Sequence, residues 1–448
     1  MNLAPENATV KQALSAHAAI GLVAGALLYL VSLSGAVAVF YQEWQRVEQP
    51  NAPEMSTISP DAVQRAVEAV MASEKGKPPT THLYVHLPVA PLPRATITTD
   101  TQAVHVDASG RIAGAEQIAW SDFLVALHYT LNLPAIWGLT IVGGLGVMML
   151  ALSLSGVVAH PRIFRDAFRL RARDKGGIGL ADWHNRLSVW TLPFTVAIAF
   201  TGALIGVAYV TAFGVATTSY GGDLEAVYAP IFGEEGKPDK TAAPAPDVAA
   251  ALGYMRQHYP QAELTYVTLH DPGTAGQHIQ VLGEHQRRLI FGEYYTFDGA
   301  GKFHGVAGLA DGSLGQQAAA SNYRLHFGNF GGLPVKLAYL VFGLILTAIC
   351  ATGTYIWLGK RERRGVEQPR LRSLWDAVVW GSPLMLAVTF IARKLLGNDA
   401  PLAEIFWIGM AALLASAWIV TTRDTLAKWL QRALVASLVL VLAMIWRG

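Results

Sequence analysis

The amino-acid sequence predicts a polytopic α-helical membrane protein with about seven transmembrane helices, two extracytoplasmic α+β domains and an internal tandem repeat. Three observations lead to this prediction. Hydrophobic residues make up 52% of the 448-residue chain and charged residues only 15%, whereas soluble proteins carry roughly 25% charged residues. Seven segments are apolar over about the 20 residues that a bilayer requires. Long polar segments separate the first span from the second and the third from the fourth.

The predicted segments alternate between the membrane and the two aqueous sides. In chain order they are a cytoplasmic tail at 1–15, a span at 16–40, an outer domain at 41–134, a span at 135–159, a basic loop at 160–186, a span at 187–212, an outer domain at 213–334, a span at 335–358, a basic loop at 359–374 and a C-terminal region at 375–448 with the last three spans. The tryptophans of this last region, Trp375 and Trp407 among them, are interpreted as interfacial anchors.

Basic residues set the predicted orientation, because short positively charged loops stay in the cytoplasm. The loop after the second span carries Arg162, Arg165, Arg169, Arg171, Arg173 and Lys175, and the loop after the fourth carries Lys360, Arg361, Arg363, Arg364, Arg370 and Arg372. Both loops and the N-terminus are therefore expected in the cytoplasm, and both large polar domains on the outer side. Arg393 and Lys394, at the outer end of the fifth span, are expected to extend to the headgroups.

The composition and the missing motifs exclude several kinds of site. Cys350 is the sole cysteine, which excludes an internal disulfide, a cysteine-ligated zinc or iron–sulfur site and covalent haem attachment. The net charge is only +2, so the protein has no strongly positive electrostatic field that would favour binding of nucleic acid. The sequence contains neither a Gly-x-Gly-x-x-Gly after a strand nor a phosphate-binding Gly-x-x-x-x-Gly-Lys-Ser/Thr, so it has no recognisable nicotinamide, flavin or ATP site. Thirteen histidines remain as candidate metal ligands.

Four of these histidines recur with a Ser/Thr-Gly pair at matched spacings. His17 precedes Gly35 by 18 residues and His184 precedes Gly202 by 18, in the first and third spans. His128 and His326 precede the second and fourth spans, and lie 28 and 27 residues before Gly156 and Gly353. The recurrence in matching order indicates two copies of one unit, each a span, an outer domain and a span.

The two outer domains repeat as well. Each begins with an amphipathic helical pattern, at 61–73 and 247–258, and continues with strand-like alternation. Each closes on the same turn pattern, Asp107 to Ile112 in the first domain and Asp298 to Phe303 in the second. Both domains are therefore expected to be a helix followed by strands.

A helix-then-strands module that closes on Asp-x-x-Gly-basic-apolar resembles a PepSY domain, and a histidine paired with Ser/Thr-Gly in one span resembles the PepSY-associated transmembrane family. The resemblance covers about residues 12–360, and residues 374–448 lie outside it. That family includes iron-regulated inner-membrane proteins and di-haem ferric-siderophore reductases. The resemblance implies a multi-pass protein of the bacterial inner membrane that reduces a ferric siderophore.

The positions of the four histidines predict two haems. Eighteen residues of helix cover about 27 Å, close to the hydrocarbon thickness, so His17 and His184 are expected at the cytoplasmic level and His128 and His326 near the outer face. We predict that His17 and His184 ligate the iron of an inner haem, and that His128 and His326 ligate the iron of an outer haem. Both are expected to be haem b, because the chain has no Cys pair for attachment, and no catalytic residue separate from haem is expected.

Other histidines are weaker candidates. His160 also lies at the cytoplasmic level, but the position equivalent to it in the second repeat is Trp357, so it remains an alternative inner ligand without symmetry support. His82 and His86 share one face of an expected strand. They are interpreted as solvated strand residues, with contact to a metal complex as the alternative.

The expected function is electron transfer to an extracytoplasmic ferric complex, a ferric siderophore or another ferric chelate, with a cytoplasmic reductase or a quinol as electron donor. Two alternatives remain open from the sequence. One is a non-enzymatic PepSY protein whose outer domains bind a peptide or protease and whose helices anchor it in the lipid bilayer. The other is a transporter for a metal complex, for which the parallel repeat without mid-span Gly/Pro breaks is unfavourable.

Overall fold

The computed structural model describes residues 7–162, 178–232, 239–285, 289–290, 292–308, 313–419 and 423–447. The chain divides into two compact units. The first, here the helical unit, comprises Met1–Tyr41, Ile118–Tyr209 and Leu325–Gly448; the second, here the sheet unit, comprises Gln42–Gln117 and Val210–Arg324. Residues 163–177, which make up most of the predicted basic loop at 160–186, lie outside the described residues.

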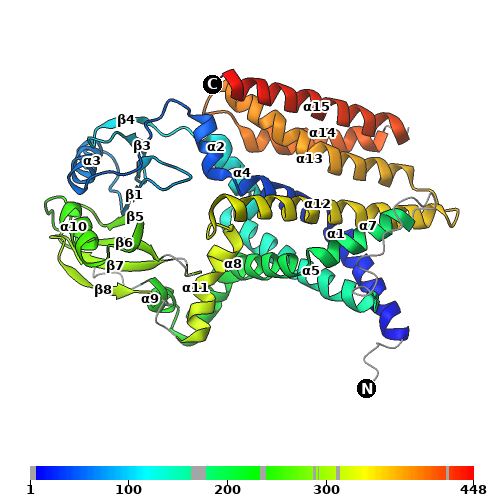
Figure 1. Cartoon of the computed structure of the whole chain (residues 1–448), viewed down its shortest axis with the longest axis horizontal. Helices are drawn as coiled ribbons and strands as arrows, with labels where there is room; N and C mark the ends of the chain where they lie inside the picture. Colours follow the sequence, from blue (N-terminus) through cyan, green and yellow to red (C-terminus); the bar gives the residue numbers. More distant parts are fainter. Residues whose placement is uncertain are drawn as a thin grey trace. The chain divides into compact units, whose positions relative to one another are not determined.

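Long helices form the helical unit (Figure 1). They are α1 (Asn7–Ala38), α4 (Ala119–Thr130), α5 (Ala135–Ala159), α7 (Ile178–Trp190), α8 (Leu192–Ser219, which continues into the sheet unit), the end of α11 (Leu314–Phe327), α12 (Gly332–Glu362), α13 (Pro369–Leu396), α14 (Leu402–Ile419) and α15 (Arg423–Arg447). Within the described residues, seven helices are long and apolar enough to cross a membrane: α1, α5, α8, α12, α13, α14 and the Thr425–Trp446 part of α15. The predicted number of spans is confirmed.

Short helices before three of the spans carry candidate ligands. His128 lies on α4 and His326 on α11, and each of these helices ends before the adjoining span begins. α4 stops at Leu131, whose φ of 57° is left-handed, and Pro134 precedes α5. His184 lies on α7 and not in the span itself, because the helix is interrupted at Thr191. Pro193 has no backbone N–H to continue the α7 hydrogen-bond ladder, so α8 starts as a new helix.

Small residues bring the spans of the helical unit into close contact. A Cβ on Gly206 of α8 would lie 2.5 Å from the Cα of Gly143 of α5, and a Cβ on Gly343 of α12 would lie 2.9 Å from the Cβ of Ala36 of α1. Without a side chain, glycine lets two helix backbones approach, which is how membrane helices gain packing contacts. Helices α1, α5, α8 and α12 therefore form one closely packed group, with Leu28 and Leu145 in its apolar core.

Helix α13 is the central helix of the C-terminal region, with α14 and α15 beside it (Figure 1). Its Trp375 is 7% exposed and its indole N–H donates to the Ala351 carbonyl of α12 at 3.0 Å. Trp407 donates to the Leu131 carbonyl at 3.1 Å. Both tryptophans join helices to one another, and Trp375 is buried inside the unit rather than turned outward as an interfacial anchor would be. Arg393 is 6% exposed and packed inside the unit, so it does not extend to headgroups as expected.

The sheet unit contains one eight-stranded antiparallel sheet with the strand order β4-β3-β2-β1-β5-β6-β7-β8. Its first segment supplies α2 (Tyr41–Glu48), α3 (Pro60–Ser73), β1 (His82–His86), β2 (Ala95–Thr98), β3 (Ala103–Val106) and β4 (Ile112–Ala115). Its second segment supplies α9 (Glu225–Phe232), α10 (Val248–His258), β5 (Ala262–His270), β6 (His278–His285), β7 (Glu293–Asp298) and β8 (Phe303–Ala307). Each segment thus contributes a helix followed by four strands, and β1 pairs with β5 where the two segments meet.

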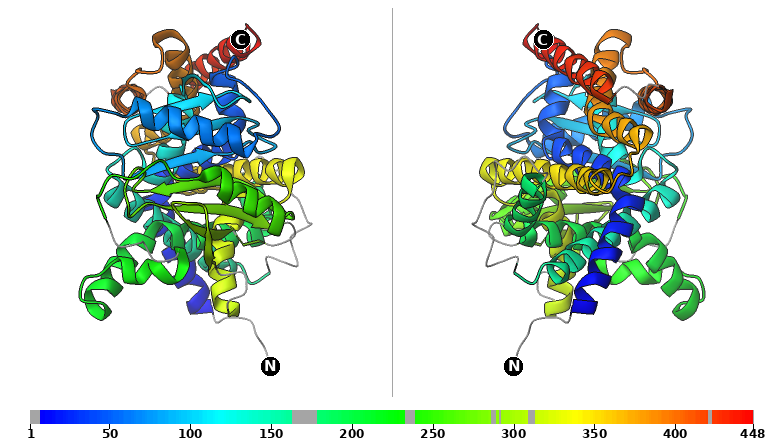
Figure 2. Two further views of the ribbon diagram at one scale, coloured as in Figure 1. Left: turned by 90° about the vertical axis from the view of Figure 1, so that its left-hand side faces the viewer. Right: turned by 90° about the vertical axis from the view of Figure 1, so that its right-hand side faces the viewer.

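Helices α3 and α10 lie side by side on one face of the sheet (Figure 2). The strands alternate, so Leu83 and Val85 of β1 and Val267 and Leu269 of β5 point to the helices and are buried. Side chains at the intervening positions, such as Tyr84, lie on the opposite face. The two helices begin with side-chain caps: Ser59 accepts from the Ala62 N–H, and Asp247 accepts from the Ala250 N–H.

The repeated turn pattern has a physical explanation in both segments. Asp107 Oδ1 accepts from the backbone N–H groups of Ser109 and Arg111, and Asp298 Oδ1 accepts from those of Ala300 and Lys302. The Ser109 hydroxyl, followed by the backbone N–H groups of the turn, holds the pKa of Asp107 below its usual value. At Asp298 burial acts to raise the pKa, and hydrogen bonds from Lys302, His304 and Ala300 outweigh it, so that this pKa is lowered as well. The glycine of each turn has positive φ and faces a helix. Its Cβ would lie 2.1 Å from the Ala62 carbonyl oxygen at Gly110, and 2.6 Å from the Ala250 Cβ at Gly301.

Replacing Gly301 with valine is expected to destabilise the sheet unit by at least about 2 kcal/mol, because a β-branched residue is strained at positive φ and the new side chain would collide with α10. Gly305→Val in β8 is the matched control, since a Cβ there meets nothing within 4 Å. Thermal unfolding of the purified protein, followed by circular dichroism, measures the difference. Equal midpoints for the two variants would contradict this account of the turn.

Candidate functional site

The structure brings the four candidate histidines together as two pairs in the helical unit. His17 of α1 lies beside His184 of α7, with ring centroids 6.4 Å apart and ring planes at 89°. His128 of α4 lies beside His326 of α11, with centroids 6.0 Å apart and planes at 24°. These are the two pairs expected from the repeat. All four imidazoles are partly buried, so each keeps some accessible surface.

Each ring of the first pair is oriented by a hydrogen bond that it donates to an acceptor on another helix. His17 Nδ1 lies 3.0 Å from the Leu152 carbonyl oxygen and 3.2 Å from the Ser155 hydroxyl, both on α5. His184 Nδ1 lies 2.9 Å from the Thr352 hydroxyl of α12. Because Thr352 donates its own proton to the Ala348 carbonyl, its oxygen accepts from the imidazole. Nδ1–H is the donor in both rings, and Nε2 is left as the nitrogen that can bind a metal.

The second pair is held in the same way. His128 Nδ1 donates to the Val31 carbonyl of α1 at 2.9 Å. His326 Nδ1 lies 3.0 Å from the Thr201 hydroxyl of α8, which donates its proton to the Ala197 carbonyl and accepts from the ring. Ligand histidines in metal sites almost always donate the second ring N–H to such an acceptor, which fixes the tautomer and the ring orientation.

The glycine of each Ser/Thr-Gly pair makes room for one of these rings. A Cβ at Gly35 would lie 2.5 Å from His128 Cε1, and a Cβ at Gly202 would lie 2.9 Å from His326 Cε1. At Gly156 the distance to His17 Cε1 would be 3.4 Å, and at Gly353 the distance to His184 Cε1 would be 3.5 Å. Each histidine therefore contacts the Ser/Thr-Gly of a different span. Spacing along the sequence associates each histidine with the Ser/Thr-Gly pair of its own or the next span. It does not reveal which Ser/Thr-Gly pair the ring contacts.

The two pairs lie at different levels along α1. His17 of the first pair and Val31, the acceptor for the second pair, are 14 residues apart on this helix, which corresponds to about 21 Å at 1.5 Å per residue. Helix α1 thus carries a histidine of one pair and the hydrogen-bond acceptor of the other. The packed helices α1, α5, α8 and α12 hold both pairs in one frame.

The dimensions of both pairs fit a metal ion held between two imidazoles. A metal–imidazole bond is about 2.0 Å long, so two nitrogens on opposite sides of one metal lie about 4 Å apart. Each ring centroid lies about 1.2 Å behind its nitrogen, which brings the centroids to about 6.4 Å. The distances of 6.4 Å and 6.0 Å agree with this value. The donor set, two oriented neutral imidazoles in an apolar bundle, suits six-coordinate haem iron.

His160 is the C-cap residue of α5, and its backbone N–H donates to the Val157 carbonyl. The inner pair assigned from the sequence is formed by His17 and His184 without it.

Several of the other histidines line the face of the sheet that is turned away from α3 and α10. His82, His270 and His278 lie opposite one another on β1, β5 and β6, with neighbouring centroids 4.9 Å and 4.2 Å apart. Burial, together with the neighbouring His278, lowers the pKa of His270 to about 4. Burial, with a contribution from Arg94, lowers the pKa of His105 to about 4. Among the described residues, His, Cys, Asp and Glu side chains form no group of three or more that could hold a metal ion.

Comparison with known proteins places this arrangement in a family. The family described as PepSY-associated TM region matches residues 14–360, which include all four paired histidines and their Ser/Thr-Gly partners. The chain is also similar to a Pseudomonas aeruginosa protein named Uncharacterized protein PA4219, with 26% identity over 334 residues that cover 65% of this chain and 79% of the relative. With its apolar helices, this match makes the chain a multi-pass membrane protein. It belongs to the PepSY-associated TM region family.

Proposed function

We propose that the chain holds two b-type haems and carries electrons across the bacterial inner membrane to a ferric complex on the outer side. The observation that carries this proposal is the geometry of the two histidine pairs, with centroid distances of 6.4 Å and 6.0 Å and an oriented Nδ1–H on every ring. His17 and His184 would hold the inner haem, and His128 and His326 the outer haem. Each haem, when bound, takes up and releases one electron.

The residues around the pairs suit this role. Hydrogen bonds from Nδ1 place the proton of each neutral imidazole on that nitrogen, which leaves the Nε2 lone pair available to a metal. The spans that carry the pairs have an apolar core, and an apolar environment would give a bound haem a low dielectric. The two levels along α1 would let electrons cross most of the bilayer thickness within one chain.

The proposed direction follows from charge and connectivity. Basic side chains cluster where α12 ends and α13 begins, at Lys360, Arg361, Arg363, Arg364, Arg370 and Arg372, and such clusters stay in the cytoplasm. The sheet-unit segments join the opposite ends of α1, α5, α8 and α12. The sheet unit would therefore lie outside the membrane, and the His128–His326 pair near the outer face. Electrons would enter on the His17–His184 side from a cytoplasmic reductase or a quinol.

The two sheet segments would correspond to two PepSY-like domains in a tandem repeat. The element order supports this assignment, since each segment has one capped helix, four strands and the same Asp-x-x-Gly turn. The proposed substrate class is a ferric siderophore or a similar ferric chelate. It rests on the family resemblance and on the chemistry of iron, because hard oxygen ligands hold iron(III) more tightly than iron(II), and reduction therefore loosens the complex.

Reduced-minus-oxidised absorption spectra of the purified protein, followed by anaerobic addition of a ferric siderophore, test the proposal. We expect b-type haem bands that disappear on addition of the chelate, with iron(II) trapped by a ferrous indicator in proportion. A colourless protein from haem-replete cells would contradict it, and would favour a function in which the helices only anchor the outer domains.

The Nδ1 acceptors provide a further prediction. Thr352→Val keeps the shape of the side chain but removes the acceptor of His184, leaving a buried N–H without its partner. Loss of such a supporting hydrogen bond usually weakens metal binding by about 10- to 100-fold. Thr347→Val is the control on α12, since the Thr347 hydroxyl also bonds a carbonyl of its own helix, that of Gly343, but supports no histidine. Haem retained after size-exclusion chromatography should fall in Thr352→Val alone; unchanged retention would show that this bond does not support the ligand.

A further inference from the structure

A cavity of about 410 Å³ lies in the helical unit among α12, α13 and α15, and none of the four paired histidines lines it. Its walls are formed by Tyr355, Glu362, Arg372, Asp376, Trp380, Ala427 and Gln431. All of these except Tyr355 lie beyond residue 360, where the family match ends. The cavity is therefore a feature of the C-terminal region that the family relationship does not explain.

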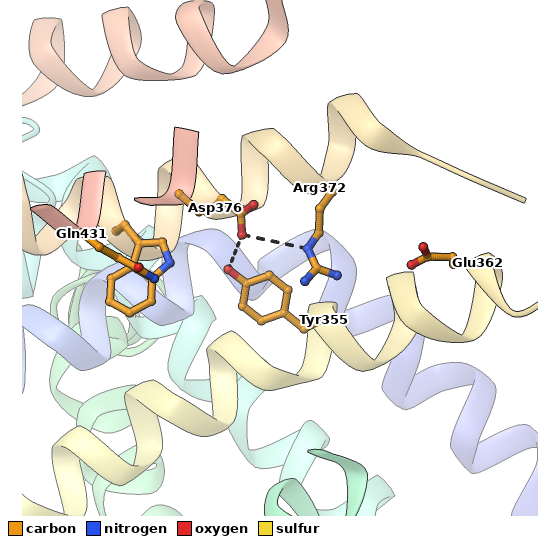
Figure 3. Close-up of a pocket in the computed structure, with 7 residues that line it drawn as sticks. Tyr355, Glu362, Arg372, Asp376 and Gln431 are labelled. Atoms are coloured by element: carbon orange, nitrogen blue, oxygen red, sulfur yellow. Dashed lines mark hydrogen bonds and ion pairs between the residues drawn. The ribbon is translucent and has the colours of Figure 1, made fainter. Parts of the chain in front are cut away.

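The polar wall of this cavity is built around a buried carboxylate. Asp376 is 6% exposed and accepts a hydrogen bond of 2.6 Å from the Tyr355 hydroxyl. Arg372 Nε lies 4.0 Å from Asp376 Oδ1, too far for a hydrogen bond, and its guanidinium lies over the Tyr355 ring at 4.7 Å (Figure 3). An acidic side chain inside a membrane-spanning helix is costly, and such residues usually have a function.

Helix α15 forms another wall of the cavity and turns much of its own surface outward. Ala427 and Gln431 belong to α15, of which only 11% of the spanning window is buried, and Trp429 and Val435 on this helix are 62% and 61% exposed. The cavity thus places a buried carboxylate beside a helix whose outer face is exposed and apolar. Trp380 adds an aromatic surface beside the carboxylate.

The cavity also lies close to the first histidine pair along the chain. Tyr355 is three residues, about 4.5 Å of helix rise, from Thr352, which accepts the hydrogen bond from His184. Trp375, in the same turn of α13 as Asp376, donates to the Ala351 carbonyl. The same stretch of α12 thus carries Tyr355 of the cavity wall and Thr352, the hydrogen-bond acceptor of His184.

We propose that this cavity binds the head group of a membrane quinol and that the quinol is the electron donor, an inference that rests on the function proposed above. A quinol hydroxyl can donate to Asp376, while Arg372 can donate to the second oxygen. An anionic lipid headgroup fits less well, because its phosphate would face the Asp376 carboxylate. Oxidation to the quinone breaks two O–H bonds and releases two electrons, one for each of two ferric haems, and two protons, the first to Asp376 and the second to cytoplasmic water.

Anaerobic stopped-flow mixing of the haem-loaded protein in phosphatidylcholine nanodiscs with decylubiquinol tests the proposal. Wild type should show haem reduction with a rate that saturates with quinol. Asp376→Asn should slow it by about 100-fold, the usual effect of losing a general base, and Tyr355→Phe should slow it by about 10-fold. Glu404→Gln, an exposed acid on α14, is the control and should match wild type. Dithionite should reduce the haems of all four proteins, which shows that the variants are folded and loaded.

A binding measurement that does not depend on haem separates the two proposals. Equilibrium dialysis should show saturable decylubiquinone binding to wild type and Glu404→Gln, weakened at least 10-fold in Asp376→Asn. Equal binding and equal quinol-driven rates in wild type and Asp376→Asn would overturn the quinol site while leaving the haem function intact. Displacement of the quinone by added phosphatidylglycerol would also overturn it, and would assign the cavity to a lipid. Protein without haem would refute the proposed function, and dialysis would still decide what the cavity binds.

Discussion

Replacing His128 with alanine should remove one of the two haems and leave the spectrum of the other unchanged. The substitution deletes one axial ligand of the His128–His326 pair, and a haem with one remaining protein ligand is bound far more weakly. The His17–His184 pair takes its supporting hydrogen bonds from Leu152, Ser155 and Thr352, none of which contacts His128. A pyridine haemochrome assay should therefore return half of the wild-type haem per chain.

The control for this variant is His160→Ala. His160 is the one other histidine that the sequence places at the level of the inner pair, and in the structure it caps α5. The His160→Ala protein should keep the full wild-type haem content. Loss of both haems from a folded His128→Ala protein, or loss of one from His160→Ala, would show that the ligands are paired differently.

Replacing His326 with alanine should abolish electron transfer to a ferric complex on the outer side. The wild-type protein is placed in liposomes with the sheet unit facing outward, and its haems are reduced. A membrane-impermeant ferric chelate added outside should then reoxidise these haems. His326→Ala removes the outer ligand that Thr201 orients, so the same chelate should leave the inner haem reduced. An internal donor should still reduce that inner haem, because its own ligands are unchanged. Absorbance at the haem bands follows both reactions.

Sidedness is the control for this second prediction. The chelate trapped inside the liposomes should react slowly with either protein, because the outer pair is on the other side. Reoxidation of wild type only by trapped chelate would reverse the proposed orientation. Undiminished transfer in His326→Ala would remove the His128–His326 pair from the electron path.

The sequence was sufficient to predict the spans and the four histidines because both depend on local pattern. Apolar runs of about 20 residues are read directly from composition, and a repeat makes equivalent positions visible by spacing alone. The turn glycines Gly110 and Gly301 were found in the same way, since Asp-x-x-Gly recurs in both outer segments. The structure adds that these glycines have positive φ and touch a helix.

Contacts between helices could not be predicted, because they depend on how the helices pack. Spacing associates His17 with Gly35 in one span, whereas in the structure His17 contacts Ser155 and Gly156 of α5. The same limit explains Trp375, whose aromatic side chain near a helix end is typical of an interface, yet whose indole bonds a carbonyl of α12. The pairing of β1 with β5, which joins the two outer segments in one sheet, also has no local signal.

The cavity around Asp376 shows a third kind of limit. A single carboxylate within a predicted span, such as Asp376, gives no local sign of a partner on another helix. Its hydrogen bond with Tyr355 and its place beside α15 become visible only when three helices, from residues 355 to 431, are brought together. The sequence therefore left the C-terminal region without a function.

Haem content per chain tests the central proposal most directly. The pyridine haemochrome assay on protein purified from haem-replete cells, divided by the chain concentration from amino-acid analysis, should return two non-covalent haems b per chain, since two histidine pairs have the spacing of axial ligands. A value of one or none from folded protein would contradict the assignment of His17, His128, His184 and His326 as ligands of two haems.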